Sequence, residues 1–108
     1  MVRTLSPDAT RLLATGVGSI EKLEMLVALA RHTERCATIA DLARDARLPP
    51  AIARRIATEM QRARVVEVTP NGQVRLAPRD PRDRAAVEEM LAMHANMPAV
   101  LLRLLHDR

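Results

Sequence analysis

Hydrophobic residues recur at helical spacing in the middle of the chain. Between residues 51 and 62 a large apolar side chain falls at every fourth position, which predicts an amphipathic helix with one buried face. The repeating residues are Ile52, Ile56 and Met60. The segment 38–46 has a similar amphipathic pattern and is followed by Leu48-Pro49-Pro50, where proline disfavours helical backbone. The pattern therefore predicts two helices that meet at a sharp turn.

The periodicity changes after this helix pair. Residues 65–68 contain three valines and residues 73–76 contain Val74 and Leu76; the two runs flank the segment 69–72, which contains Asn71-Gly72. Asn-Gly between two such runs is typical of a tight β-hairpin turn. We therefore expect a mainly α fold with a small β-hairpin, a winged helix-turn-helix. Such a module places its second helix in the major groove of DNA.

Helix start and stop residues predict further helices on both sides. Ser6, Ser19, Thr38 and Asp80 each stand where a side chain could cap a helix, and Pro7 and Pro81 occupy first-turn positions. Pro98 should interrupt the last helical stretch. At 108 residues the chain is the size of one domain. We expect a winged-helix core over residues 19–78 and a C-terminal helical arm over residues 79–108.

The C-terminal arm is too apolar to lie free in water. It could fold back on the domain, or it could pack against a second copy, which we favour because a small winged-helix domain has little core left to cover. A surface for a different protein is the alternative. The expected dimer contacts are Val87, Met90, Leu91, His94, Met97, Leu101, Leu104 and Leu105.

Composition favours duplex DNA over single strands or RNA. The chain has no Phe, Trp or Tyr, the rings on which proteins usually stack unpaired bases. Its net charge is +4, and all but one of the Lys and Arg residues are Arg. A GC-rich coding sequence would also favour arginine. Residues 38–66 nevertheless hold six arginines against three acids, whereas residues 79–108 hold five charges of each sign.

The exposed face of the second helix and the wing carry the candidate DNA contacts. Arg54 and Arg55 are early in the helix and are the best candidates for base edges or phosphates, while later arginines should touch the backbone only. The full set is Thr38, Ala51, Arg54, Arg55, Thr58, Arg62, Arg64, Asn71 and Arg75. The alternative is that these are ordinary solvated arginines. Glu59 would weaken such a surface unless it pairs with Arg55 or Arg62.

The sequence offers little for catalysis or metal binding. Cys36 is the only cysteine, which excludes an internal disulfide and fits a reducing compartment. His32 and Cys36 are four residues apart, so a redox or metal sensor is a weak third hypothesis. No nucleophile–base arrangement or glycine-rich phosphate loop is apparent. We expect a cytoplasmic protein that is not an enzyme, with no cofactor and no membrane segment, since the start lacks a signal peptide's apolar run.

The segment from Lys22 to Pro78 resembles the DNA-binding part of the Rrf2 family of bacterial transcription regulators. The resemblance rests on the run from Thr38 to Val66, with its Leu-Pro-Pro turn, on the preceding helix, and on Val74-Arg75-Leu76-Ala77. It implies a homodimer joined through C-terminal helices. Three features depart from the family: Arg64 replaces a usual glycine, the wing is short, and the cysteines that hold an iron–sulfur cluster are missing. The resemblance therefore implies a cluster-free relative.

These observations predict a DNA-binding transcription regulator that acts as a homodimer on double-stranded DNA. Helix 51–62 and the short wing 65–76 would read the duplex. The alternative is a winged-helix protein-interaction module that docks a partner through its apolar C-terminal arm.

Overall fold

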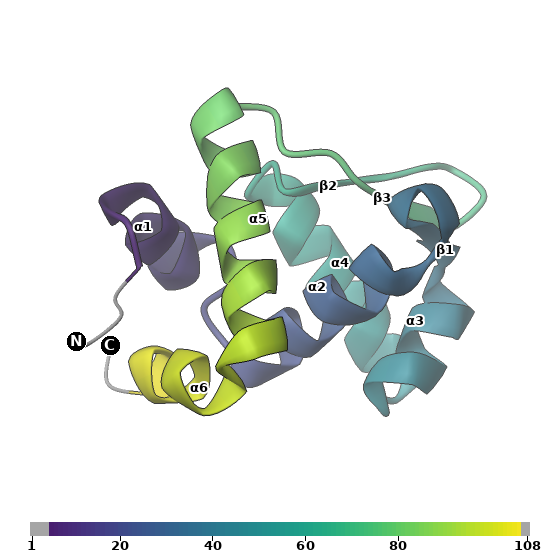
Figure 1. The fold of residues 1–108 in the computed structure, drawn as a ribbon. Coiled ribbons are helices and arrows are strands. Elements are labelled where there is room, and N and C mark those ends of the chain that lie inside the picture. The colour runs from purple at the N-terminus through teal and green to yellow at the C-terminus, as the bar shows by residue number, and fades with distance from the viewer. Residues whose placement is uncertain (1–4, 107–108) are drawn as a thin grey trace.

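The protein is mainly helical with a small antiparallel sheet, in a computed structural model that describes residues 5–106 (Figure 1). The helices are α1 (Pro7–Thr15), α2 (Ile20–Arg31), α3 (Ile39–Ala46), α4 (Pro50–Arg62), α5 (Pro81–Asn96) and α6 (Pro98–His106), with a 3₁₀ turn η1 (Thr33–Arg35). The strands are β1 (Cys36–Thr38), β2 (Val66–Val68) and β3 (Gln73–Leu76). Within residues 5–106, every helix is too short or too polar to cross a lipid bilayer.

Four helices begin at the capping residues that the sequence predicts. The hydroxyl of Ser6 accepts a hydrogen bond from the Ala9 amide at 3.2 Å, and Ser19 and Thr38 cap α2 and α3 in the same way. The Asp80 carboxylate caps α5 through the Arg82 amide at 2.8 Å. A side-chain acceptor at this position satisfies an amide that has no partner inside the helix. Pro98 separates α5 from α6 as expected.

The predicted hairpin is present, and it belongs to a three-stranded sheet of order β1-β3-β2. Strand β1 was not expected from the sequence, because three residues are too few to show a period. It pairs antiparallel with β3, so that Ala37 lies opposite Val74, and both side chains are buried against the helices. Arg75 lies between Cys36 and Glu67 in the register and is exposed on the outer face.

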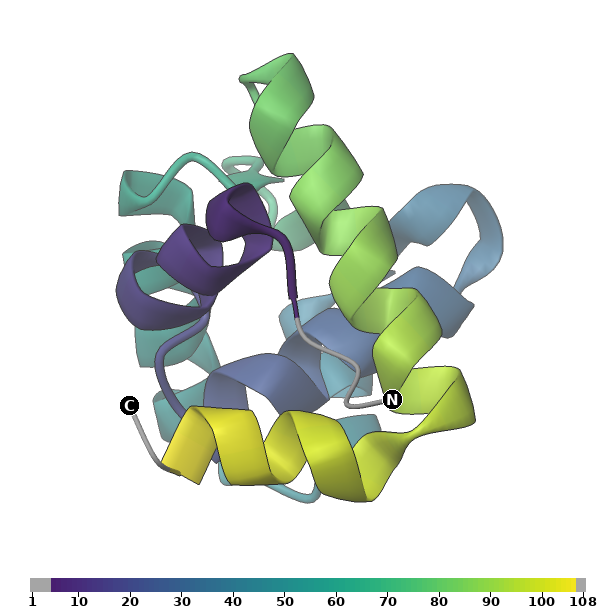
Figure 2. The ribbon, with the colours of Figure 1, turned by 60° about the vertical axis from the view of Figure 1, so that its left-hand side comes forward.

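Helix α2 runs through the middle of the molecule and packs against α3, α4 and β3 (Figure 1). Helices α3 and α4 and the sheet lie to one side of α5, and α1 and α6 lie to the other. In the turned view, α1, α5 and α6 stand together on the near side (Figure 2). The C-terminal helix α6 packs against α5.

The C-terminal arm folds back on its own chain, which corrects the expectation for four of its eight predicted dimer contacts, because these four side chains are buried. Val87, Met90, Leu101 and Leu105 are between 0% and 5% exposed and belong to the hydrophobic core. Four other expected contacts, Leu91, His94, Met97 and Leu104, are half-buried. The arm has an intrachain surface to cover because α1, which lies outside the winged-helix core, packs against α5. Its last two residues lie outside the described part of the chain.

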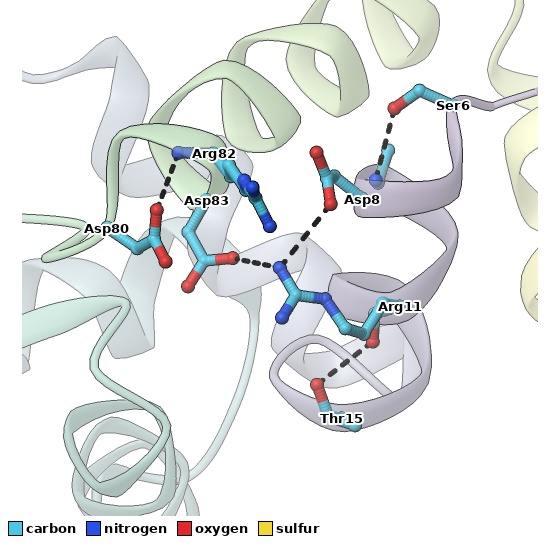
Figure 3. Close-up of polar contacts among 8 residues, drawn as sticks. Ser6, Asp8, Arg11, Thr15, Asp80, Arg82 and Asp83 are labelled. Carbon is cyan, nitrogen blue, oxygen red and sulfur yellow. Dashed lines mark hydrogen bonds and ion pairs between the residues drawn. The ribbon is translucent and has the colours of Figure 1, made fainter.

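Ionic contacts also tie the arm to the N-terminal helix. The Arg11 guanidinium lies between Asp83 of α5, at 3.1 Å, and Asp8 of α1, at 3.6 Å (Figure 3). The backbone amide of Ser6 donates to the Glu89 carboxylate at 2.6 Å. The start of the described chain and helix α5 are therefore joined by polar as well as apolar contacts.

Candidate nucleic-acid interface

Helix α4 separates its apolar and basic residues onto two faces. Ala53, Ile56, Ala57 and Met60 are buried, whereas Ile52 is only half-buried, so small alanines complete the buried face that the sequence assigned to Ile52. The opposite face is exposed and holds Ala51, Arg54, Arg55, Thr58 and Arg62. The amphipathic pattern of this helix therefore places every predicted α4 contact on the solvent side.

A hollow of about 400 Å³ lies between α4 and the tip of the β2–β3 hairpin. Three of the predicted contact residues line it, namely Arg54 and Thr58 from the helix and Asn71 from the hairpin. The Thr58 hydroxyl donates to the Arg54 carbonyl at 3.0 Å, which fixes its position on the helix surface. The Asn71 side-chain carbonyl accepts from the Thr69 hydroxyl, which orders the turn. Helix and hairpin thus present polar side chains to one shared space.

The N-terminus of α4 has no side-chain cap. Pro49 occupies the capping position, Pro50 begins the helix, and the first turn contains no acid. In α1, α2, α3 and α5, by contrast, a side chain caps the helix and an acid lies in the first turn. The amides of Ala51 and Ile52 therefore point out of the helix start without an acceptor among residues 5–106, and a helix start of this kind attracts anions.

The arginines of this surface have no carboxylate partner. Within the described part of the chain, ion pairs engage the basic residues Arg11, Lys22, His32, Arg35 and Arg44. None of those pairs includes Arg54, Arg55, Arg62, Arg64 or Arg75. Glu59 pairs with Lys22 of α2 at 3.5 Å and not with Arg55 or Arg62. The acid on α4 is thus paired with a lysine of α2 and not with the exposed arginines.

The structure leaves some predicted contacts outside the hollow. Thr38 is half-buried and its hydroxyl caps α3, so it is already engaged. Arg75 lies on the outer face of the sheet. Arg62 and Arg64 are exposed at the end of α4 opposite to its uncapped start.

His32 and Cys36 do not form a joint site. The His32 Nε2 lies 2.7 Å from the Asp45 carboxylate, and this hydrogen bond lowers the pKa of Asp45 below its usual range, with the nearby Arg44 adding to the effect. The Cys36 sulfur instead faces the Gln73 side-chain carbonyl at 3.9 Å. Among residues 5–106, no three His, Cys, Asp or Glu side chains gather in a way that could hold a metal ion.

Comparisons with family models, with curated proteins and with solved structures found no match to this chain. The resemblance to the Rrf2 family therefore stays a prediction from the residues quoted above. The case for a function rests on the surface of α4 and the hairpin.

Proposed function

We propose that this protein is a DNA-binding transcription regulator of the winged helix-turn-helix type. Helix α4 would be the recognition helix and the β2–β3 hairpin the wing. The observation that carries the proposal is the exposed face of α4, whose arginines form no ion pair within residues 5–106 and one of which, Arg54, lines a hollow shared with the hairpin tip. The order of elements, two helices joined by a short turn and followed by a hairpin, agrees with such a module.

Each part of this surface suits a group on duplex DNA. Arg54 and Arg55 can donate paired hydrogen bonds to guanine edges or to phosphates. The unbonded backbone amides at the start of α4 can donate hydrogen bonds to a phosphate oxygen. Asn71 can reach a flanking phosphate or the minor groove from the hairpin tip. Recognition of this kind needs no aromatic ring, and the chain has none.

The proposal includes two copies of the chain on one site, because helix-turn-helix proteins commonly read half-sites in successive major grooves. The four core residues of the arm are not part of that contact, since they are buried in their own chain. The same burial leaves these four side chains out of any contact between the arm and another protein.

The test is binding to labelled duplex fragments, rich in GC, over a series of salt concentrations. An Arg54→Glu/Arg55→Glu variant would be compared with Arg31→Glu/Arg103→Glu. The control changes the net charge equally at two exposed arginines of α2 and α6 that lie outside the proposed surface. Circular dichroism would establish that all three proteins fold.

We expect the parent chain and the control variant to bind with a steep salt dependence, because each neutralised phosphate releases counterions. The Arg54→Glu/Arg55→Glu variant should lose binding. If duplex binding weakens equally in both variants, binding depends on net charge alone and α4 is not the recognition helix. If the folded parent chain does not bind duplex even at low salt, the regulator hypothesis is wrong.

A further inference from the structure

Helix α4 ends with Arg64 in a left-handed backbone conformation, with φ of 64°. The Val65 amide donates to the Met60 carbonyl at 3.0 Å, and the Arg64 amide donates to the Gln61 carbonyl at 2.9 Å. This pair of bonds is the usual way in which a helix ends at a left-handed residue, and glycine is strongly preferred there because it has no Cβ. Arginine at this position therefore costs stability.

No ion pair in the described chain offsets this loss of stability. The Arg64 side chain is exposed, and no carboxylate pairs with it among the described residues. A residue held in a left-handed conformation although its exposed side chain forms no ion pair in the described chain is a reason to look for a role outside the fold.

Arg79, which follows the hairpin, lies beside Arg64. The Arg79 amide donates to the Arg64 carbonyl at 3.3 Å, and both residues line a surface hollow of about 490 Å³. A second hollow of about 140 Å³ also has both in its lining, together with Glu67. Arg79 is exposed and has no ion pair in residues 5–106 either. Arg64 and Arg79 are thus adjacent in the fold, and no ion pair within residues 5–106 occupies either guanidinium group, so both can take an anion from solvent.

Three acids line the two hollows, Glu67 the smaller and Asp80 and Asp83 the larger, and among the described residues none of them forms an ion pair with Arg64 or Arg79. In the larger hollow, Asp80 caps α5 and Asp83 binds Arg11, as Figure 3 shows. The two arginines of this hollow can therefore bind an anion from solvent.

We propose that Arg64 and Arg79 form a second contact site that binds a phosphate of the duplex backbone outside the groove occupied by α4. This inference rests on the proposed function and extends it. A 13-residue helix is about 20 Å long, so the pair is well separated from the open helix start. Contacts to phosphate hold a protein in position on the duplex and carry no sequence information. The site should thus add affinity on every duplex alike.

Arg64→Gly tests this because it changes stability and binding in opposite directions. Glycine relieves the left-handed backbone, so the melting temperature should rise by several degrees. The loss of one exposed charge pair should weaken duplex binding roughly two- to fivefold, and the slope of log affinity against log salt should fall by about 0.9. Arg79→Ala should weaken binding by a similar factor, and Arg103→Ala, an equal change of charge on α6, should leave it unchanged.

Two results would overturn the inference. If Arg64→Gly raises the melting temperature but leaves affinity and salt slope unchanged, while Arg54→Glu/Arg55→Glu abolishes binding, the regulator hypothesis stands and the second site is wrong. If Arg64→Gly weakens binding on one sequence only, the residue reads bases and does not hold phosphate. A parent chain that fails to bind any duplex would overturn both proposals, and the salt series on the parent chain shows this first.

Discussion

At the scale of the single residue, α3 and α4 are each followed by an arginine in a left-handed backbone conformation. Arg47 follows α3 with φ of 57°, and the Leu48 amide donates to the Ala43 carbonyl at 2.8 Å. Arg64 repeats this arrangement after α4. Both left-handed residues therefore border α4, where a glycine would form the same turn with less strain.

Arg47→Gly should accordingly stabilise the protein. A left-handed residue with a Cβ costs about 1–2 kcal/mol, and the greater freedom of glycine in the unfolded chain offsets part of the gain, so we expect a net of roughly 0.5–1 kcal/mol. Urea unfolding followed by circular dichroism measures the difference. Arg55→Gly is the matched control, because Arg55 lies inside α4 and should lose about 1 kcal/mol. Equal losses in both variants would contradict the explanation.

At the scale of the element, local chemistry could be predicted from the sequence and long-range pairing could not. The caps Ser6, Ser19, Thr38 and Asp80 and the Asn-Gly turn act within three or four residues, so their side chains identify them directly. Strand β1 exists because β3 offers it an open edge, and three residues carry no period by themselves. The partner of Glu59 is also long-range, since Lys22 comes from a different helix.

In the candidate site, too, the local pattern could be predicted from the sequence and the long-range contact could not. The amphipathic pattern of α4 correctly separates its exposed arginines from its buried residues, apart from Ile52. The pairing of Arg64 with Arg79 was missed because Arg79 was counted with the charge-balanced arm. Only the fold brings the residue after the hairpin back to the end of α4. The one indication in the sequence that Arg64 has a special role was that it replaces a glycine usual in the Rrf2 family.

The contact between η1 and α5 gives a prediction about pH. Arg35 donates two hydrogen bonds to Glu88, and these bonds lower the pKa of Glu88 below its usual range. A carboxylate whose folded pKa is depressed stabilises the fold above its unfolded value, about 4.3, and loses that contribution as the pH falls through the folded pKa. Glu88→Gln should thus lower stability at pH 7 by no more than about 1 kcal/mol, because the pair is exposed.

The difference between Glu88→Gln and the parent chain should shrink toward zero as the pH approaches 2–3. Urea unfolding at pH 7 and at the lowest pH where the parent chain still folds makes the comparison. Glu24→Gln, an exposed residue of α2 without an ion pair in the described chain, is the control and should show little change at either pH. A constant difference across the pH range would mean that Glu88 acts by packing.

At the scale of the whole molecule, the arm is part of the core. Leu101 has no exposed surface, and Leu101→Ala should destabilise the protein by about 2–5 kcal/mol. Because the side chain is buried in its own chain, the loss should not depend on protein concentration. Thermal unfolding over a hundredfold range of concentration tests this. A melting temperature that rises with concentration in the parent chain, and a loss in the variant that varies with it, would restore the arm as a dimer interface.

The distribution of paired and unpaired charges gives the last prediction. Glu59 is the one acid on α4, and Lys22 of α2 pairs with it at 3.5 Å. Glu59→Gln removes the negative charge and frees the lysine, so the α4 surface gains positive potential without a new residue. Duplex affinity at low salt should rise by a few-fold, and the gain should disappear at high salt because exposed charges are screened. Glu21→Gln is the control, since it changes the net charge equally on the exposed surface of α2. An equal gain in both variants would show that total charge decides binding, whereas a gain in Glu59→Gln alone would support α4 as the face that meets DNA.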